Sequence, residues 1–163
     1  MKRVIVITVL AASSFCTPQG GSQEVAFVRL GGLTGTTVCT EQNAPLILLN
    51  WEIRTDTAEV AEVMAHELIH VRQMNEYLPG GCKAAQLRYL ADPEFRFDQE
   101  LEAYCVNARR DVALRGAPPG LTVIRLTVFM MRLHPTALTG QQVLARARAC
   151  INRPMTITPK TPY

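Results

Sequence analysis

The hydrophobic and polar positions divide the chain into a strand-like N-terminal part and a longer part with helical periodicity. Three short runs rich in β-forming residues cover Val25–Val28, Thr36–Cys39 and Leu46–Leu49. They are separated by glycines and by a turn containing asparagine and proline. We expect these runs to form a small antiparallel sheet.

Helical patterns follow, and capping residues or helix breakers bound most of them. The first expected helix runs from Thr57 to Tyr77, after a capping pair of Asp56 and Glu59. Asp92-Pro93 begins a long helix that Gly116 ends. Between 121 and 133 the run is compatible with strand or helix, and the polar residues that share one helical face favour helix. Further helices are expected over residues 84–90 and after Thr139, where Gln142 completes a capping box.

Composition supports one α+β domain. The chain has 163 residues, of which 48% are hydrophobic and 19% charged, which is typical of a globular protein. We place the domain at residues 24–153, preceded by a flexible or signal segment over 1–23 and followed by a loose, proline-rich tail over 154–163.

The N-terminus and the cysteines favour export to the periplasm or the cell exterior. Lys2 and Arg3 precede a short apolar run and then small residues, which is the order found in a secretory signal. If residues 1–14 instead form a buried strand, the protein is cytoplasmic. Without Cys16, four cysteines remain, and an exported protein could pair them in three ways as two disulfides: Cys39, Cys82, Cys105 and Cys150. Four buried free thiols are the alternative.

Charge and hydropathy exclude two classes of partner. The net charge of +3 is small and scattered, so we expect no nucleic-acid partner. No apolar run reaches the 18 or so residues that span a bilayer, so we expect no stable membrane span.

The most informative motif is His66-Glu67-Leu68-Ile69-His70. On a helix, His66 and His70 project from one face, one turn apart, and can hold a single Zn²⁺. Glu67 lies about 100° around the helix, where it can reach a metal-bound water without being a ligand. This HExxH pattern is typical of zinc hydrolases in which the glutamate is the general base. A coincidental, purely structural pair of histidines is the alternative.

A catalytic zinc centre needs a third protein ligand and leaves the fourth position to water. The next long helix offers Glu100 and Glu102, which lie about 200° apart around a helix, so only one can face the metal. The spacing leaves this choice open. The remaining histidine, His134, is either a surface residue beside Pro135 or a hydrogen-bond donor to a tetrahedral oxyanion.

The segments 66–73 and 100–104 together resemble the gluzincin metallopeptidases, particularly their minimal single-domain members. The resemblance covers about residues 46–115 and implies a zincin-like fold with Glu100 as the third ligand and Ala103 allowing close helix packing. It also implies that Leu46–Leu49 is an edge strand along which substrate adds. Many relatives have an aspartate where this chain has Tyr104, whose phenol oxygen could accept a hydrogen bond from a ligand imidazole.

The sequence therefore predicts a zinc metallopeptidase with one Zn²⁺ per chain, a peptide or protein substrate, and Glu67 as general base. The main alternative is a non-catalytic zinc domain that acts by binding a partner. A metal-free envelope protein held by disulfides is the third possibility. No pattern indicates the cleavage specificity or the oligomeric state.

Overall fold

The computed structural model describes residues 23–153. The predicted signal sequence, Cys16 and the proline-rich tail lie outside these residues. Within them the chain is α+β and mostly helical, with a three-stranded sheet followed by five α-helices.

The sheet is mixed, and its strand order corrects two predictions. The strands are β1 (Glu24–Val28), β2 (Gly35–Cys39) and β3 (Pro45–Asn50), in the spatial order β1-β3-β2. β3 pairs in parallel with β1 and antiparallel with β2, so the prediction of a wholly antiparallel sheet is wrong. β3 is also the central strand, so the prediction that Leu46–Leu49 forms an edge is wrong.

Asn50, at the end of β3, explains this topology. Its side-chain amide donates to the carbonyl oxygens of Leu30 and Leu33, at 3.1 and 2.8 Å. The backbone amide of Asn50 donates to the carbonyl of Thr34 at 2.8 Å. These bonds hold the β1–β2 connection across the end of β3, so β1 and β2 lie on opposite sides of that strand.

The helices follow the predicted order closely. Asp56, Asp92 and Thr139 are the N-caps of three of them, as their sequence patterns predict, and Gly116 ends the third α-helix with a φ of 67°. The segment after Pro118 is helical rather than extended. The bounds are η1 Trp51–Ile53, α1 Thr57–Glu76, α2 Gly81–Ala91, α3 Pro93–Arg115, α4 Pro119–Leu133 and α5 Gly140–Ile151.

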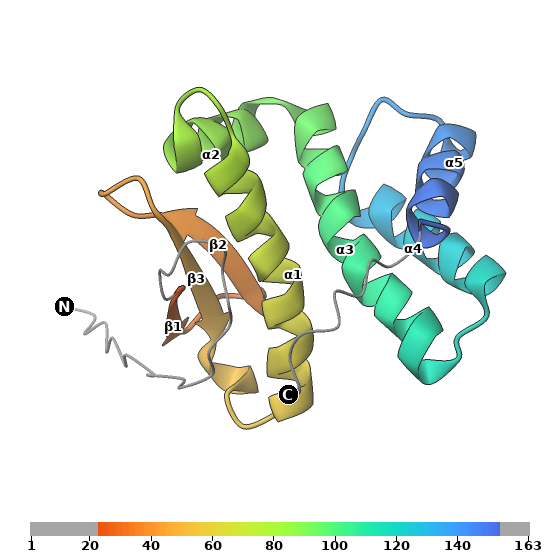
Figure 1. Ribbon diagram of the computed structural model, residues 1–163, viewed down its shortest axis with the longest axis horizontal. Coiled ribbons are helices and arrows are strands. Elements are labelled where there is room, and N and C mark those ends of the chain that lie inside the picture. The colour runs from red at the N-terminus through yellow and green to blue at the C-terminus, as the bar shows by residue number, and fades with distance from the viewer. Residues whose placement is uncertain (1–22, 154–163) are drawn as a thin grey trace.

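The elements form layers around α1 and α3. Figure 1 shows α1 between the sheet and α3, with α4 and α5 on the far side of α3. One core, which includes Ile47, Leu49 and Val71, lies between the sheet and α1. A larger core, which includes the fully buried Phe97 and Met130, joins α3 to α4 and α5. Each long helix therefore packs on both sides, with α1 and α3 in contact between the two cores.

Two cysteine pairs connect these layers. Cys39 on β2 pairs with Cys82 on α2, and Cys105 on α3 pairs with Cys150 on α5. Their Cα–Cα distances of 5.8 and 6.2 Å lie in the range of disulfides. Each closes a loop of more than 40 residues, for which a stabilisation of about 2–4 kcal/mol is typical. Paired cysteines are common in oxidising, extracellular environments.

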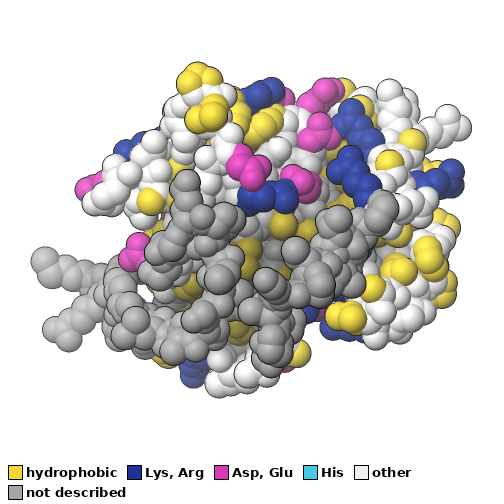
Figure 2. All heavy atoms as spheres, viewed as in Figure 1, with side chains coloured by type: hydrophobic (Ala, Val, Ile, Leu, Met, Phe, Trp, Pro, Cys, Tyr) yellow, Lys and Arg dark blue, Asp and Glu magenta, His cyan; other side chains and the backbone are white. Residues whose placement is uncertain are grey.

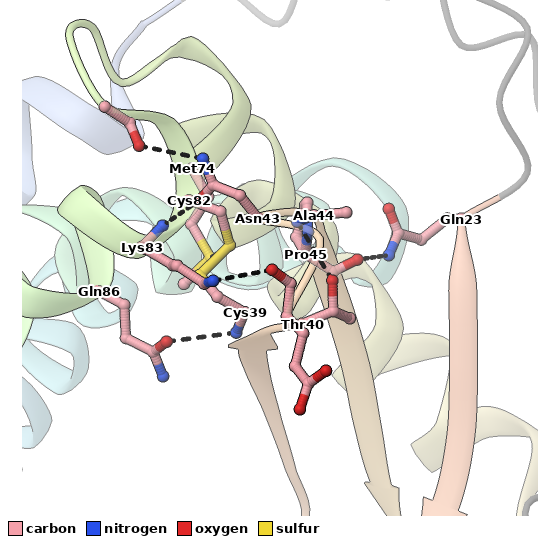
Figure 3. The surroundings of a disulfide bond; sticks show 12 residues. Gln23, Cys39, Thr40, Asn43, Ala44, Pro45, Met74, Cys82, Lys83 and Gln86 are labelled. Carbon is pink, nitrogen blue, oxygen red and sulfur yellow. Dashed lines mark hydrogen bonds between the residues drawn. A yellow bond between two sulfur atoms is a disulfide. The ribbon is translucent and has the colours of Figure 1, made fainter.

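Hydrogen bonds reinforce the junction of β2 with α2 around the first disulfide. Figure 3 shows the amide of Cys39 donating to the side-chain oxygen of Gln86, at 3.3 Å. The amide of Lys83, next to Cys82, donates to the side chain of Asn43 at 2.7 Å. The C-terminal end of β2 is therefore held against α2 by covalent and polar contacts.

No helix among residues 23–153 combines the length and hydrophobicity needed to cross a bilayer.

Candidate metal centre

The two histidines of the motif face the same point from consecutive turns of α1. The Nε2 atoms of His66 and His70 are 3.1 Å apart, and both residues are buried. Two imidazole nitrogens this close together inside the protein could share one bound cation. The spacing of the motif had predicted this arrangement.

Glu100 on α3 completes the group. Its Oε2 lies 3.5 Å from Nε2 of His66, and its Oε1 lies 3.4 Å from Nε2 of His70. Its side chain is only 7% exposed. Of the two carboxylates that the sequence left open, Glu100 is the one that the structure brings to the histidines.

The three residues fit a metal ion. One ligand atom from each of His66, His70 and Glu100 can be chosen so that all lie within 4.8 Å of one another. Tetrahedral zinc with bonds of about 2.0–2.1 Å has ligand atoms about 3.3 Å apart, close to the separations seen here. Two imidazoles and one carboxylate are also a donor set that zinc accepts. The site can therefore hold a divalent cation of this kind.

Glu102 hydrogen-bonds to Gln73, which in turn contacts His70. The Gln73 side-chain amide donates to Oε2 of Glu102 at 2.7 Å and to the backbone carbonyl of Gln99 at 3.1 Å. Its carbonyl oxygen therefore faces Nδ1 of His70, at 2.8 Å. Nδ1 must carry the proton, which leaves the lone pair of Nε2 free to bind a metal.

The role of Gln73 was missed at the sequence level, although it lies three residues after His70. That spacing places both side chains on one helical face. Arg72 strengthens the same cluster by an ion pair with Glu102, at 2.6 Å.

Tyr89 on α2 contacts Glu100, the candidate third ligand. Its hydroxyl donates a hydrogen bond to Oε1 of Glu100. Burial and the neighbouring Glu100 carboxylate raise the pKa of the Tyr89 phenol, so it stays protonated and remains a donor. No local spacing in the sequence relates Tyr89 to Glu100, because the two residues lie on different helices.

Tyr104 lies against His66 through its ring. The ring centroids are 4.3 Å apart and the planes are tilted by 57°. Nδ1 of His66 is buried and has no hydrogen-bond partner among the described residues, so the Tyr104 oxygen does not accept a hydrogen bond from it. Burial, with the nearby Glu100 and Glu67, raises the pKa of Tyr104 to about 12. Tyr104 therefore acts as an apolar wall of the site.

Glu67 has a hydrogen-bond partner on β2. Thr37 on β2 donates from its hydroxyl to Oε2 of Glu67 at 2.7 Å, and both residues are buried. Gly35, two residues earlier, allows the close approach, since a Cβ there would lie 2.5 Å from Cγ1 of Val63 and 3.2 Å from Oε1 of Glu67. The sheet edge and the motif glutamate are therefore in direct contact.

Burial raises the pKa of Glu67, and this outweighs the opposing effect of the Thr37 hydrogen bond and of the two histidines. A carboxylate with a raised pKa is a better proton acceptor than an ordinary glutamate. Such perturbed groups cluster at functional sites.

His134, at the C-terminal end of α4, also reaches this group. Its Nε2 lies 3.7 Å from Oε2 of Glu100 and is buried without a hydrogen-bond partner among residues 23–153. Burial lowers the pKa of His134, so its imidazole is neutral near pH 7. The sequence had left its role open, and the structure places it beside the candidate ligands.

The same contacts give the metal-free protein a pH-dependent stability. Burial alone would raise the pKa of Glu100, but hydrogen bonds from His66 and His70 hold it well below its ordinary 4.5. Burial opposes the charge on His70, yet Glu100 holds the His70 pKa above its ordinary 6.5. The Glu100 contribution is lost as pH falls through its lowered pKa, and the His70 contribution is lost as pH rises through its raised pKa.

We therefore expect the chelator-treated protein to be more stable to urea at about pH 5.5 than at about pH 8, because both contributions are present together between the two ordinary values. Ionisation of buried Glu67 lowers stability in the same direction as pH rises. The lowered pKa of His134 acts in the opposite direction, so the comparison with Glu100→Gln isolates the Glu100–His70 pair. Urea unfolding of the wild type and of Glu100→Gln at both pH values measures this. Equal pH dependence in the two proteins would show that the pair has no such role.

Comparisons of this chain with protein-family models, with curated proteins and with solved structures find no match to any of them.

Proposed function

We propose that this chain is a zinc-dependent metallopeptidase of the gluzincin type. The observation that carries the proposal is the convergence of His66, His70 and Glu100 on one buried point, with Glu67 on the same helix. A structural site usually has four protein ligands, whereas three of this kind leave a position open for water.

In this proposal His66, His70 and Glu100 would hold the zinc ion, one per chain. When bound, zinc polarises a scissile carbonyl and lowers the pKa of its water from about 15.7 to about 7. Glu67 takes a proton from the attacking water and returns it to the leaving amine. Thr37 holds one oxygen of Glu67 in place, and the other is left for the transferred proton. The Gln73–Glu102 pair keeps the His70 imidazole in its metal-binding tautomer.

A peptide substrate would add to β2 rather than to β3. β2 is an edge of the described sheet, and its contacts with Glu67 put that edge beside the metal centre. The Cys39 amide points away from β3, toward Gln86. Because backbone direction alternates along a strand, the amides of Gly35 and Thr37 point outward too. They can bond an extended peptide, main chain to main chain.

The test is cleavage of a degenerate peptide library by the full chain, with and without a chelator. We expect zinc near one per chain and cleavage that the chelator abolishes and added zinc restores. Cleavage that persists in the metal-free protein would contradict the proposal. Sequencing of the products would define the cleavage specificity.

His134 supports a second candidate function, a non-catalytic zinc domain that acts by binding a partner. Its Nε2 is buried near Glu100 and has no hydrogen-bond partner in the described part of the chain, so it could supply a fourth ligand and close the site. The variant His134→Ala separates the two functions. It would release zinc and lower thermal stability if His134 is a ligand. In the peptidase it would keep zinc and, if His134 donates to the oxyanion, lower turnover.

A further inference from the structure

Helix α4 exposes an apolar stripe on the side away from the core. Four large side chains recur at intervals of three and four residues and are 43–61% exposed: Leu121, Ile124, Val128 and Met131. The opposite side of α4 is buried against α3 and α5. Figure 2 shows hydrophobic side chains at the lower right of the molecule, where Figure 1 places α4. A soluble helix normally has charged or polar residues on this face.

The two charged residues of α4 itself are both basic. Arg125 and Arg132 lie next to it around the helix and are exposed. Neither forms an ion pair within the described part of the chain, where the other long helices do form such pairs. From Pro119 to Ile151 the sequence has four arginines and no aspartate or glutamate. The stripe therefore requires a partner that is apolar and negatively charged.

A second copy of this chain does not meet that requirement. If two α4 stripes packed on each other, Arg125 and Arg132 of both copies would be brought together without an acidic residue on either helix. Like charges at such short range are unfavourable. An anionic bilayer surface does meet it, because acyl chains accept the apolar stripe while arginine side chains extend to the phosphates.

We propose that α4 is a membrane-surface helix, which lies in the interface of a bilayer that contains anionic phospholipids. The stripe enters the acyl boundary, and Arg125 and Arg132 remain at the headgroup level. This binding is peripheral, and it holds whether or not the metal centre is catalytic.

The test is co-sedimentation of the full chain with vesicles. The probes are vesicles of equal parts phosphatidylglycerol and phosphatidylcholine, and vesicles of phosphatidylcholine alone. We expect the wild type to bind the anionic vesicles and to bind the neutral ones far more weakly. Ile124→Asn with Val128→Asn should lower the bound fraction by about tenfold or more. Arg125→Gln with Arg132→Gln should lower it and weaken its dependence on salt.

The matched control is Leu87→Asn with Leu90→Asn on α2, which removes two leucines that are 68% and 66% exposed. This variant should bind as the wild type does. If the α4 variants melt at the wild-type temperature and still bind the vesicles as the wild type does, another segment makes the membrane contact and the proposal is overturned. Failure of the wild type to sediment would overturn it as well. A third result would also overturn the proposal. Light scattering would show that the wild type is a dimer and that the Ile124→Asn/Val128→Asn variant is a monomer, while sedimentation shows no vesicle binding.

Discussion

Replacement of Glu67 by glutamine is expected to abolish peptide cleavage while the metal stays bound. Glutamine has nearly the same shape and can still accept the hydrogen bond from Thr37, so the helix and the ligand residues keep their places. It cannot take a proton from water at neutral pH. General-base catalysis is typically worth about 10²–10⁴-fold, and we expect a fall in kcat of at least that order. Steady-state kinetics and metal analysis of the same sample measure both effects.

The control for this variant is Glu76→Gln. Glu76 lies on the same helix, its side chain is 70% exposed, and its ion pair with Arg72 is long, at 3.9 Å. Its replacement should leave kcat and metal content unchanged. If Glu67→Gln cleaves peptides as fast as Glu76→Gln, the proton transfer assigned to Glu67 is wrong.

The second large effect is expected from Glu100→Gln, compared with Glu102→Gln on the same helix. Glu100 faces both imidazoles, and its loss would leave two neutral ligands for a divalent cation. Glu102 contacts Gln73, which orients His70, and Arg72. Loss of such an outer partner lowers metal affinity by about 10–100-fold, and we expect Glu100→Gln to exceed that range.

Competition with a chromophoric chelator measures the two affinities, and thermal melting of the metal-free proteins checks that both variants fold. An equal or larger loss in Glu102→Gln would reverse the assignment of the third ligand. His134→Ala, measured in the same way, then shows whether a fourth protein ligand takes part.

Most helices could be predicted because their signals are local. Asp56, Asp92 and Thr139 cap the amides of the residues that follow them, so a few neighbouring positions suffice to place a helix start. Strand direction carries no such local signal. The parallel pairing of β1 with β3 is accompanied by long-range contacts, such as those of the Asn50 side chain with a loop 17 to 20 residues earlier in the chain.

The residues of the candidate site also fall into those with a local sequence signal and those without one. His66, Glu67 and His70 could be predicted from their spacing, because one helix carries all three. The choice of Glu100 over Glu102 depended on a resemblance, since a helix places these residues on nearly opposite sides. Thr37, Tyr89 and His134 come from three further elements, and only the packing of those elements brings them to the centre.

The two cysteine pairs have a consequence for the metal centre. Cys39 lies two residues after Thr37 on β2, and Cys105 lies five residues after Glu100 on α3. Each cross-link thus anchors an element that supplies a neighbour or a ligand to α1. A thiol reductant does not react with the candidate ligands themselves, but it would remove the cross-links that anchor β2 and α3 on either side of the site. We therefore expect the oxidation state of the surroundings to affect how firmly this site can hold a cation.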